Sequence, residues 1–220
     1  MKREILITAD GSSTIHLPEW DEHYHSKHGA IQEAYHVFIN NGLYQFKKAN
    51  KISILEIGFG TGLNAFITYL EAKKLQLNID YTGVEAYPVV PEEIQKLNYV
   101  ARLNVVNEQA VFEKMHSLSW SKKHTFAVRF SLTKKEQFFD KIDDVNKYDL
   151  IYFDAFGARV QPELWTVEIF NIMYKALRKD GVLVTYSAKG SVRRAMQEVG
   201  FIVERLPGPP GKREMLRGKK

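Results

Sequence analysis

The sequence of 220 residues contains no cysteine. This absence excludes disulfides, a thiolate nucleophile and thiolate metal sites, and it is compatible with the reducing cytoplasm, the compartment that we expect. The apolar runs are too short to span a bilayer, and the N-terminal MKREILITADG lacks the long apolar segment of a signal peptide. We therefore expect neither a signal peptide nor a membrane partner.

The size and charge of the chain are those of an ordinary globular domain. Its length suits one domain with a full hydrophobic core. Lysine and arginine number 31 against 26 acidic residues, which gives a net charge of +5. This mild excess permits an RNA partner, although a solvated, lysine-rich surface explains it equally well.

Strand-like and helix-like segments alternate from residue 51 onward. Short runs rich in β-branched residues are typical of buried strands, and apolar residues at helical spacing are typical of helices. The expected strands lie within 51–58, 79–85, 125–132, 148–154, 182–188 and 201–206, with a last short strand after 211. The expected helices lie within 63–75, which should be amphipathic, 91–100, 107–120, 162–180 and 191–199. This alternation predicts an α/β fold with a parallel, doubly wound sheet.

The first 50 residues lie outside this alternation. The stretch ITADGSSTIHL holds two short strand-like runs around Asp10 and Gly11, which predicts a hairpin. HGAIQEAYHVFI has helical spacing and ends at NNG, a typical helix stop. We expect residues 1–50 to form an extension that packs on the domain of residues 51–220.

A glycine-rich turn follows the strand expected at 51–58. In SILEIGFGTGLN, glycines stand at positions 58, 60 and 62 between a strand and a helix. Such a turn lets a ligand approach the main chain, and dinucleotide sites share this design. However, the third glycine follows the second by two residues instead of three, and no Gly-Lys-Ser/Thr follows. The motif thus predicts a ligand site without choosing the ligand.

Two acidic residues favour S-adenosylmethionine at this turn. Glu56 lies two residues before the first glycine, where a carboxylate would tolerate an ammonium group and repel a pyrophosphate. Glu85 ends the next strand, where a carboxylate can accept hydrogen bonds from both ribose hydroxyls, although NAD enzymes also use an acid there. The alternative is a turn that only packs helix against strand, with Glu85 as a solvated strand end.

A third acid, Asp154, ends a later strand in YFDAFG. The carboxyl ends of strands in open α/β sheets face the ligand crevice. A carboxylate there can hold an amine nucleophile and accept its proton after methyl transfer. The alternative is that Asp154 caps the turn that follows.

Four stretches resemble the methyltransferase domain of the MnmC family, which completes 5-methylaminomethyl-uridine at the wobble position of bacterial tRNAs. They are HLPEWDEHYHSKHGAIQEAYHVFI, ILEIGFGTGLN, FDAFGARVQPELWT and GKREMLRG. The resemblance implies a Rossmann-like class I methyltransferase domain at 51–220 with an N-terminal extension at 1–50. It implies S-adenosyl-L-methionine as methyl donor and 5-aminomethyl-uridine of tRNA as acceptor.

The resemblance also implies residue roles. Asp154 would be the catalytic residue beside the reacting amine. The expected cofactor-binding residues are Ser26, Glu56, Gly58, Phe59, Gly60, Gly62, Asn64 and Glu85. The expected substrate-binding residues are Tyr24, His25, Phe156, Arg159, Arg193, Lys212 and Arg213. Of the latter, the cations at 193, 212 and 213 are candidates for tRNA phosphates, and a solvated basic face is the alternative.

The chain departs from the family pattern in three places. The family's Gly-Asp-Ala beside the adenine pocket corresponds to LTKKEQF, about Thr133 to Lys135. Ala155 replaces a glycine, and Arg159 stands near the place of the family's lysine. Because the chain ends soon after REMLRG, we expect a stand-alone methyltransferase without the FAD-dependent oxidase. A further partner would then supply the aminomethyl intermediate.

Five histidines cluster near the front of the chain, at positions 16, 23, 25, 28 and 36. They lack a spacing such as His-Glu-x-x-His, so we expect no metal. Two other functions remain open, namely a non-catalytic nucleotide- or RNA-binding module and a methyltransferase for small amines. An NAD-dependent oxidoreductase is disfavoured by the compressed glycine spacing and by Glu56.

Overall fold

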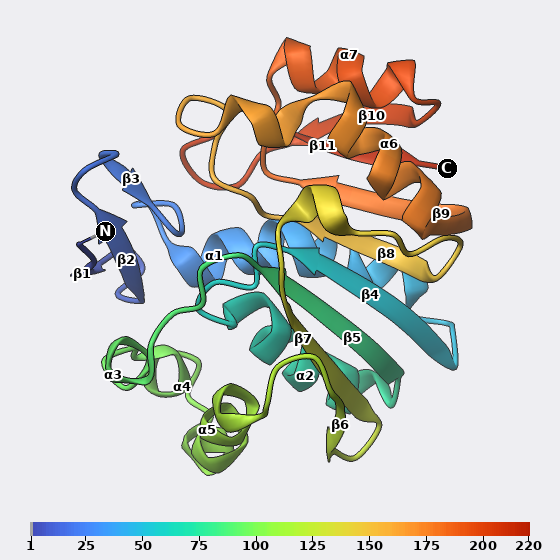
Figure 1. The fold of residues 1–220 in the computed structure, drawn as a ribbon. Helices are drawn as coiled ribbons and strands as arrows, with labels where there is room; N and C mark the ends of the chain where they lie inside the picture. The colour runs from blue at the N-terminus through green and yellow to red at the C-terminus, as the bar shows by residue number, and fades with distance from the viewer. Residues whose placement is uncertain (1) are drawn as a thin grey trace.

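The central sheet has eight strands in the order β10-β11-β9-β8-β4-β5-β7-β6 (Figure 1). The computed structural model describes residues 2–220. The strands are β4 (Lys51–Ile57), β5 (Asn78–Glu85), β6 (Lys123–Ala127), β7 (Phe130–Glu136), β8 (Tyr148–Phe153), β9 (Leu177–Thr185), β10 (Ile202–Pro207) and β11 (Glu214–Lys219). The five strands from β9 to β7 pair in parallel, and β6, β10 and β11 pair antiparallel. The expected α/β sheet is therefore confirmed, with antiparallel strands added at both edges.

The parallel register brings the predicted acidic strand ends together. Ile57 of β4 pairs with Val84 of β5 on one side and with Phe153 of β8 on the other. The glycine turn after Ile57 is therefore flanked by Glu85 and Asp154. This edge of the sheet is where a ligand crevice is expected.

Helices cover both faces of the sheet (Figure 1). The neighbouring residues Tyr152 and Phe153 are both fully buried but belong to different core clusters, because side chains alternate along a strand. One face carries α1 (Ala30–Ala34), the π-helix η1 (Tyr35–Asn40), the 3₁₀ helix η2 (Leu43–Phe46), α2 (Leu63–Leu75) and α5 (Gln109–Ser117). The other carries α6 (Val167–Ala176) and α7 (Gly190–Glu198). The shorter elements are α3 (Pro91–Ile94), α4 (Tyr99–Arg102) and the 3₁₀ helices η3 (Val106–Glu108), η4 (Phe139–Lys141) and η5 (Pro162–Trp165).

Helix α2 is not amphipathic, contrary to the sequence-based expectation. Each residue from Leu63 to Ala72 is buried. The reason is that α1 and η1 contact its outer side while β5 contacts its inner side. Residues 30–46 therefore belong to the main core, with Val37 and Phe38 almost fully enclosed.

Three expected boundaries were wrong. The run at 125–132 is a hairpin of β6 and β7, because the chain turns at Val128 and Arg129. The φ of Arg129 is 63°. The helix expected at 162–180 is η5 followed by α6, with Thr166 as the N-cap that accepts from the Ile169 amide. It ends at Ala176, because Leu177 pairs with Tyr148 and starts β9. The helix expected at 91–100 is divided into α3 and α4.

The N-terminal segment forms a separate three-stranded antiparallel sheet. Its strands are β1 (Glu4–Ile7), β2 (Ser13–Leu17) and β3 (Glu22–His23), and β1 pairs with β2 in the expected hairpin. Figure 1 shows this sheet beside the carboxyl edge of the central sheet. Within residues 2–220, no helix has both the length and the apolar character needed to cross a bilayer.

Gly83 of β5 gives a test of the packing under the glycine turn. A Cβ added at Gly83 would overlap the Phe59 ring. We expect Gly83→Ala to lower the free energy of unfolding in urea by about 1–3 kcal/mol, the usual effect of overpacking. The matched control is Gly157→Ala, where the nearest atom to the new Cβ is 3.7 Å away. Equal unfolding midpoints for the two variants would contradict the observed contact between Phe59 and β5.

Candidate active site

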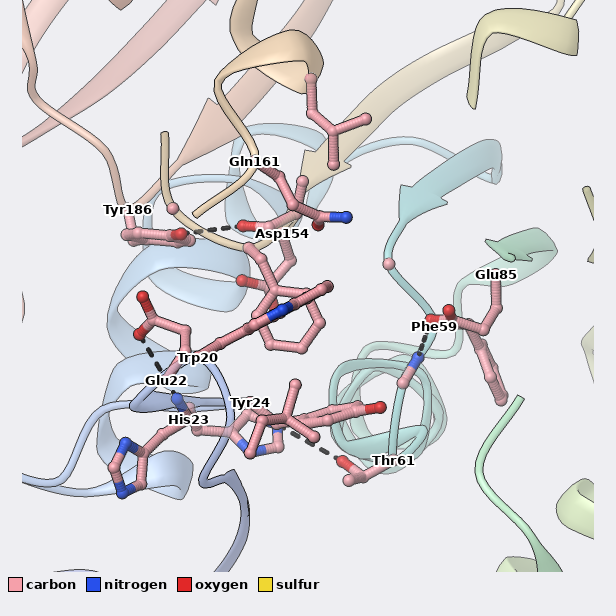
Figure 2. A pocket seen from close by; sticks show the side chains of 18 of the residues that line it. Trp20, Glu22, His23, Tyr24, Phe59, Thr61, Glu85, Asp154, Gln161 and Tyr186 are labelled. Carbon is pink, nitrogen blue, oxygen red and sulfur yellow. Dashed lines mark hydrogen bonds between the residues drawn. The ribbon is translucent and has the colours of Figure 1, made fainter. Parts of the chain in front are cut away.

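A cavity of about 1570 Å³ opens over the carboxyl edge of the central sheet (Figure 2). One wall is the loop after β4 together with Glu85 and the segment after β7. Another is the end of β8 with Asp154, and the front segment before α1 closes the third side. Figure 2 shows Glu85 and Asp154 on separate parts of the cavity wall.

The glycine turn brings two backbones into contact. Gly58, Gly60 and Gly62 all have positive φ values, of 87°, 47° and 70°. A Cβ at Gly58 would lie 2.6 Å from the carbonyl oxygen of Asp154, so only glycine allows this approach. A Cβ at Gly60 would lie 3.1 Å from the Tyr24 ring. The turn is thus held between the end of β8 and the front segment.

The Glu85 carboxylate is fixed on the cavity wall by two backbone donors. One oxygen accepts from the Gly60 amide at 3.0 Å, and the other accepts from the Tyr87 amide at 2.9 Å. Each carboxylate oxygen can accept a further hydrogen bond. The arrangement can therefore hold the paired hydroxyls of a nucleoside.

Glu56 lies beneath the turn and not on the cavity wall. It is fully buried, and burial raises the pKa of its carboxyl well above the usual range. Among residues 2–220, its two oxygens, the Tyr81 hydroxyl and Asn64 Oδ1 have no hydrogen-bond partner. Of these three residues, Asn64 lines the cavity and so connects this buried polar group to the ligand space.

Asp154 lies at the other end of the cavity, half-buried at the tip of β8. Its Oδ2 accepts a hydrogen bond from Asn64 Nδ2 at 2.8 Å. Enclosure by protein and, to a smaller extent, the nearby Glu33 carboxylate raise the pKa of Asp154 to about 7, against the opposing effects of Asn64 and Lys212. A carboxyl group with this pKa can gain and lose a proton near neutrality.

Aromatic side chains line the front of the cavity. The Phe156 ring meets the rings of Tyr24 and Trp20 edge to face, at centroid distances of 5.0 and 5.9 Å. The Arg3 guanidinium lies 5.9 Å from the Tyr24 ring. Burial raises the pKa of Tyr24 to about 12, so the phenol stays neutral. These rings form an apolar wall suited to a planar base.

His25 and Arg159 connect the front segment to the rest of the site. The two ring nitrogens of His25 lie 3.2 and 3.3 Å from the hydroxyls of Thr14 and Thr61. Burial lowers the pKa of His25 to about 4, so the ring is neutral. The Arg159 guanidinium donates to the Asp21 carbonyl at 2.8 Å and to the Glu22 carboxylate at 3.1 Å. In the same segment, the Ser26 amide donates to Glu33 at 2.9 Å.

The other front histidines do not point to a metal. His16 and His23 stack on each other, with ring centroids 4.4 Å apart. His36 Nε2 lies 2.8 Å from the Pro207 carbonyl oxygen. Within the part of the chain that the structure describes, no three His, Asp or Glu side chains are arranged to hold a metal ion.

Two of the expected substrate residues are outside the cavity, and the stretch expected beside the adenine does not line it. Arg193 on α7 and Arg213 do not line the wall. The stretch 133–135 lies inside β7, where Lys134 is buried and donates to the His116 carbonyl at 2.6 Å. The residues after β7 that line the cavity are 138–141 instead.

Sequence reasoning missed Glu33, Trp20, Tyr186 and Phe138, which all line the cavity. Tyr186 directly follows β9, so the strand-end rule that found Asp154 also applies to it. Glu33 lies on α1, and only its contacts in the folded chain reveal it. Lys212 was expected to meet phosphates, yet it forms an ion pair with Glu33.

Comparisons with known proteins agree with this geometry. A family model described as S-adenosyl-L-methionine-dependent methyltransferase matches residues 106–220. Two relatives, from Leptospira interrogans and Azoarcus sp., are both named tRNA 5-methylaminomethyl-2-thiouridine biosynthesis bifunctional protein MnmC. The first is 30% identical over 225 residues, which cover 97% of this chain and 35% of the relative. The second is 30% identical over 213 residues, which cover 89% of this chain and 32% of the relative. The chain spans about a third of the length of these relatives.

Solved structures support the same fold. The crystal structure of MnmC2 from Aquifex aeolicus matches 99% of this chain and 70% of that chain, with a TM-score of 0.76 and 26% identity. Spermidine synthase from Thermotoga maritima matches 100% of this chain and 72% of that chain, with a TM-score of 0.57. At 14% identity, this similarity shows the fold alone. The Rossmann-like fold and the resemblance to the MnmC family are confirmed.

Asp154 predicts a pH-dependent difference in stability. Between its ordinary pKa of 3.8 and its folded pKa of about 7, the folded state keeps a proton that the unfolded state releases. Wild-type stability from this group therefore falls as the pH rises through that window. We expect Asp154→Asn to gain stability relative to wild type between pH 4 and 7, with no further gain above, as measured by urea unfolding.

The control for this measurement is Asp143→Asn, because Asp143 is exposed. Its unfolding free energy should follow the wild-type pH profile. If the profile of Asp154→Asn also runs parallel to wild type, the raised pKa of Asp154 is refuted.

Proposed function

Because the chain belongs to this family of S-adenosyl-L-methionine-dependent methyltransferases, we propose that it methylates the primary amine of 5-aminomethyl-uridine at the tRNA wobble position. The product is 5-methylaminomethyl-uridine. The observation that carries the proposal is a carboxyl group with a pKa of about 7, Asp154, in a cavity that also holds the glycine turn. The names of the relatives support tRNA as the substrate.

The residues at the Glu85 end fit the cofactor. We assign the turn with Gly58, Gly60 and Gly62 to the donor, and Glu85 to its ribose hydroxyls. Asn64 lines the cavity and has an unsatisfied oxygen, which a polar group of the donor can satisfy directly or through water, whereas Glu56 lies off the cavity wall. At the rim, Tyr87 and Phe138 meet edge to face at 6.0 Å and are both exposed, so they offer apolar faces to the adenine. S-adenosylmethionine supplies an electrophilic methyl group on a sulfonium.

Asp154 acts as the proton acceptor in this proposal. A primary alkylamine is mostly protonated at neutral pH and has to lose a proton before its nitrogen can attack. The ionised Asp154 carboxylate would accept that proton first. The free nitrogen lone pair could then form the N–C bond, while the electron pair of the breaking C–S bond stays on the sulfur. Asn64 holds the carboxylate in place through its amide. The remaining contribution is placement of the nucleophile in line with the methyl group.

The front segment and nearby cations are assigned to the RNA. Tyr24 and Phe156 would shape the pocket for the uridine base, and His25 and Arg159 would hold that segment in place. Exposed cations near the opening can meet phosphates on either side of the base, namely Lys27, Lys189 and Arg213. Arg193 would act farther out along the same surface. Because tRNA is the proposed substrate, we infer that the protein acts in the cytoplasm.

The direct test is mass spectrometry of nucleosides from tRNA that carries 5-aminomethyl-uridine, incubated with the protein and the methyl donor. We expect wild type to produce the methylated nucleoside. Asp154→Asn should lower turnover by about 10²–10⁴-fold, the range for loss of a general base. Its affinity for the donor should stay near that of wild type. Methylation of small amines without methylation of this tRNA would establish the alternative, a small-molecule methyltransferase.

Glu85 gives an independent test of the donor site. Glu85→Gln removes the charge that strengthens hydrogen bonds from the ribose hydroxyls and from the Gly60 amide. We expect the dissociation constant for S-adenosylmethionine, measured by calorimetry, to rise about tenfold, which is the loss of roughly one charge-assisted hydrogen bond. Glu92→Gln, at an exposed position in α3, is the control. Equal affinities for the two variants would remove Glu85 from the donor site.

A further inference from the structure

A lysine side chain lies in the cavity wall near Asp154. Lys212 belongs to the turn between β10 and β11, and its ammonium forms an ion pair with the Glu33 carboxylate. The same ammonium lies 3.9 Å from the centroid of the Tyr186 ring. The side chains that line the cavity here are Glu33, Asp154, Tyr186 and Lys212. The end of the cavity that holds the proposed base therefore already contains a primary ammonium.

Glu33 needs a cation because it is enclosed. Its side chain is only 9% exposed, and its second oxygen accepts from the Ser26 amide at 2.9 Å. An ionised carboxylate at such a position is strongly unfavourable without a paired charge. If Lys212 leaves Glu33, another cation has to take its place.

The groups around the Lys212 ammonium are those that recognise ammonium ligands in general. A carboxylate and an aromatic face both attract a cation, and here they approach it together. The Tyr186 ring is held in position because its hydroxyl donates to the Ala155 carbonyl at 2.8 Å, next to Asp154. Glu33 and Tyr186 would hold any primary ammonium in the same way.

Lys212 can leave without unfolding its turn. Its side chain is 32% exposed and has four rotatable bonds. The turn itself is held by backbone hydrogen bonds, from the Gly208 amide to the Arg213 carbonyl and from the Lys212 amide to the Pro209 carbonyl. Withdrawal of the side chain therefore breaks the contacts with Glu33 and Tyr186 and leaves these backbone hydrogen bonds in place.

We propose that Glu33 and Tyr186 form the binding site for the ammonium of the acceptor, and that Lys212 occupies this site until the acceptor displaces it. The inference rests on the proposed function, because it names where the primary amine binds. Glu33 is paired with Lys212 in the free protein and with the acceptor ammonium after displacement. Asp154 then accepts the proton of the bound amine, and the methylated product again presents a cation to Glu33. Lys212 is thereby a specificity-determining residue. An acceptor with a neutral group in place of the ammonium would displace Lys212 only by leaving the Glu33 carboxylate without a paired cation.

Ethylammonium chloride is a suitable probe, because it carries only the primary ammonium. It is titrated into the full chain and followed by NMR, with potassium chloride as the control for ionic strength. Lys212→Met should bind ethylammonium about tenfold more tightly than wild type, because the competing side chain is gone. Lys212→Arg, which retains a cation, should stay at wild-type affinity. Adding Glu33→Gln to Lys212→Met should abolish the gain.

Equal affinity in wild type and Lys212→Met overturns the proposal, as does a gain that survives Glu33→Gln. Calorimetry with S-adenosylhomocysteine verifies that each variant keeps its cavity, and Lys212→Gln replaces the methionine variant if that one fails to fold. Binding of the probe requires neither tRNA nor methyl transfer. Failure here therefore leaves the proposed tRNA methylation standing, whereas absent tRNA methylation with intact probe binding contradicts only the acceptor.

Discussion

The whole site depends on one close approach of two backbones. The loop after β4 passes the end of β8 at Gly58, where a side chain would collide with the Asp154 carbonyl. The Asp154 amide donates to the Ile57 carbonyl at 2.9 Å, and the amides of Gly58 and Phe59 donate to the Val84 carbonyl at 3.0 Å. These bonds join three strand ends into one rigid floor. The glycine turn and the proposed base are therefore held to each other by backbone hydrogen bonds.

The electrostatics of the site follow from the close packing of these strand ends. Glu33 and Glu56 are buried and Asp154 is half-buried, so three carboxyl groups gather around the same strand ends. Glu56 lies beneath the turn, where burial disfavours its charge and raises the pKa of its carboxyl well above the usual range. Glu33 is paired with Lys212. Asp154 remains as the carboxyl group that faces the cavity and titrates near neutrality, which is the property that a proton acceptor for an amine requires.

The sequence predicts the parts of the site that follow from local rules. Gly58 and Asp154 stand directly after apolar strands and Glu85 is the last residue of one, and parallel pairing brings such positions to one edge. The pairing of Glu33 with Lys212 joins residues 179 positions apart and has no local signal. Helix and strand limits failed where packing overrides propensity, as at Leu177, whose pairing with Tyr148 ends a run of helix-forming residues. The features that the sequence did not predict are therefore those that depend on contacts between residues far apart in the chain.

The volume of the cavity and the polar groups at its two ends indicate how many ligands it can bind. A site for a single drug-sized ligand usually has about 300–1,000 Å³, whereas this cavity has about 1570 Å³. One end presents Glu85 between two backbone amides, and the other presents Asp154 beside an ammonium already paired with Glu33. A single nucleoside would satisfy one end and leave the other unused. Two ligands, one with vicinal hydroxyls and one with an amine, use both, and the rigid strand ends between them fix the direction along which a group passes from one to the other.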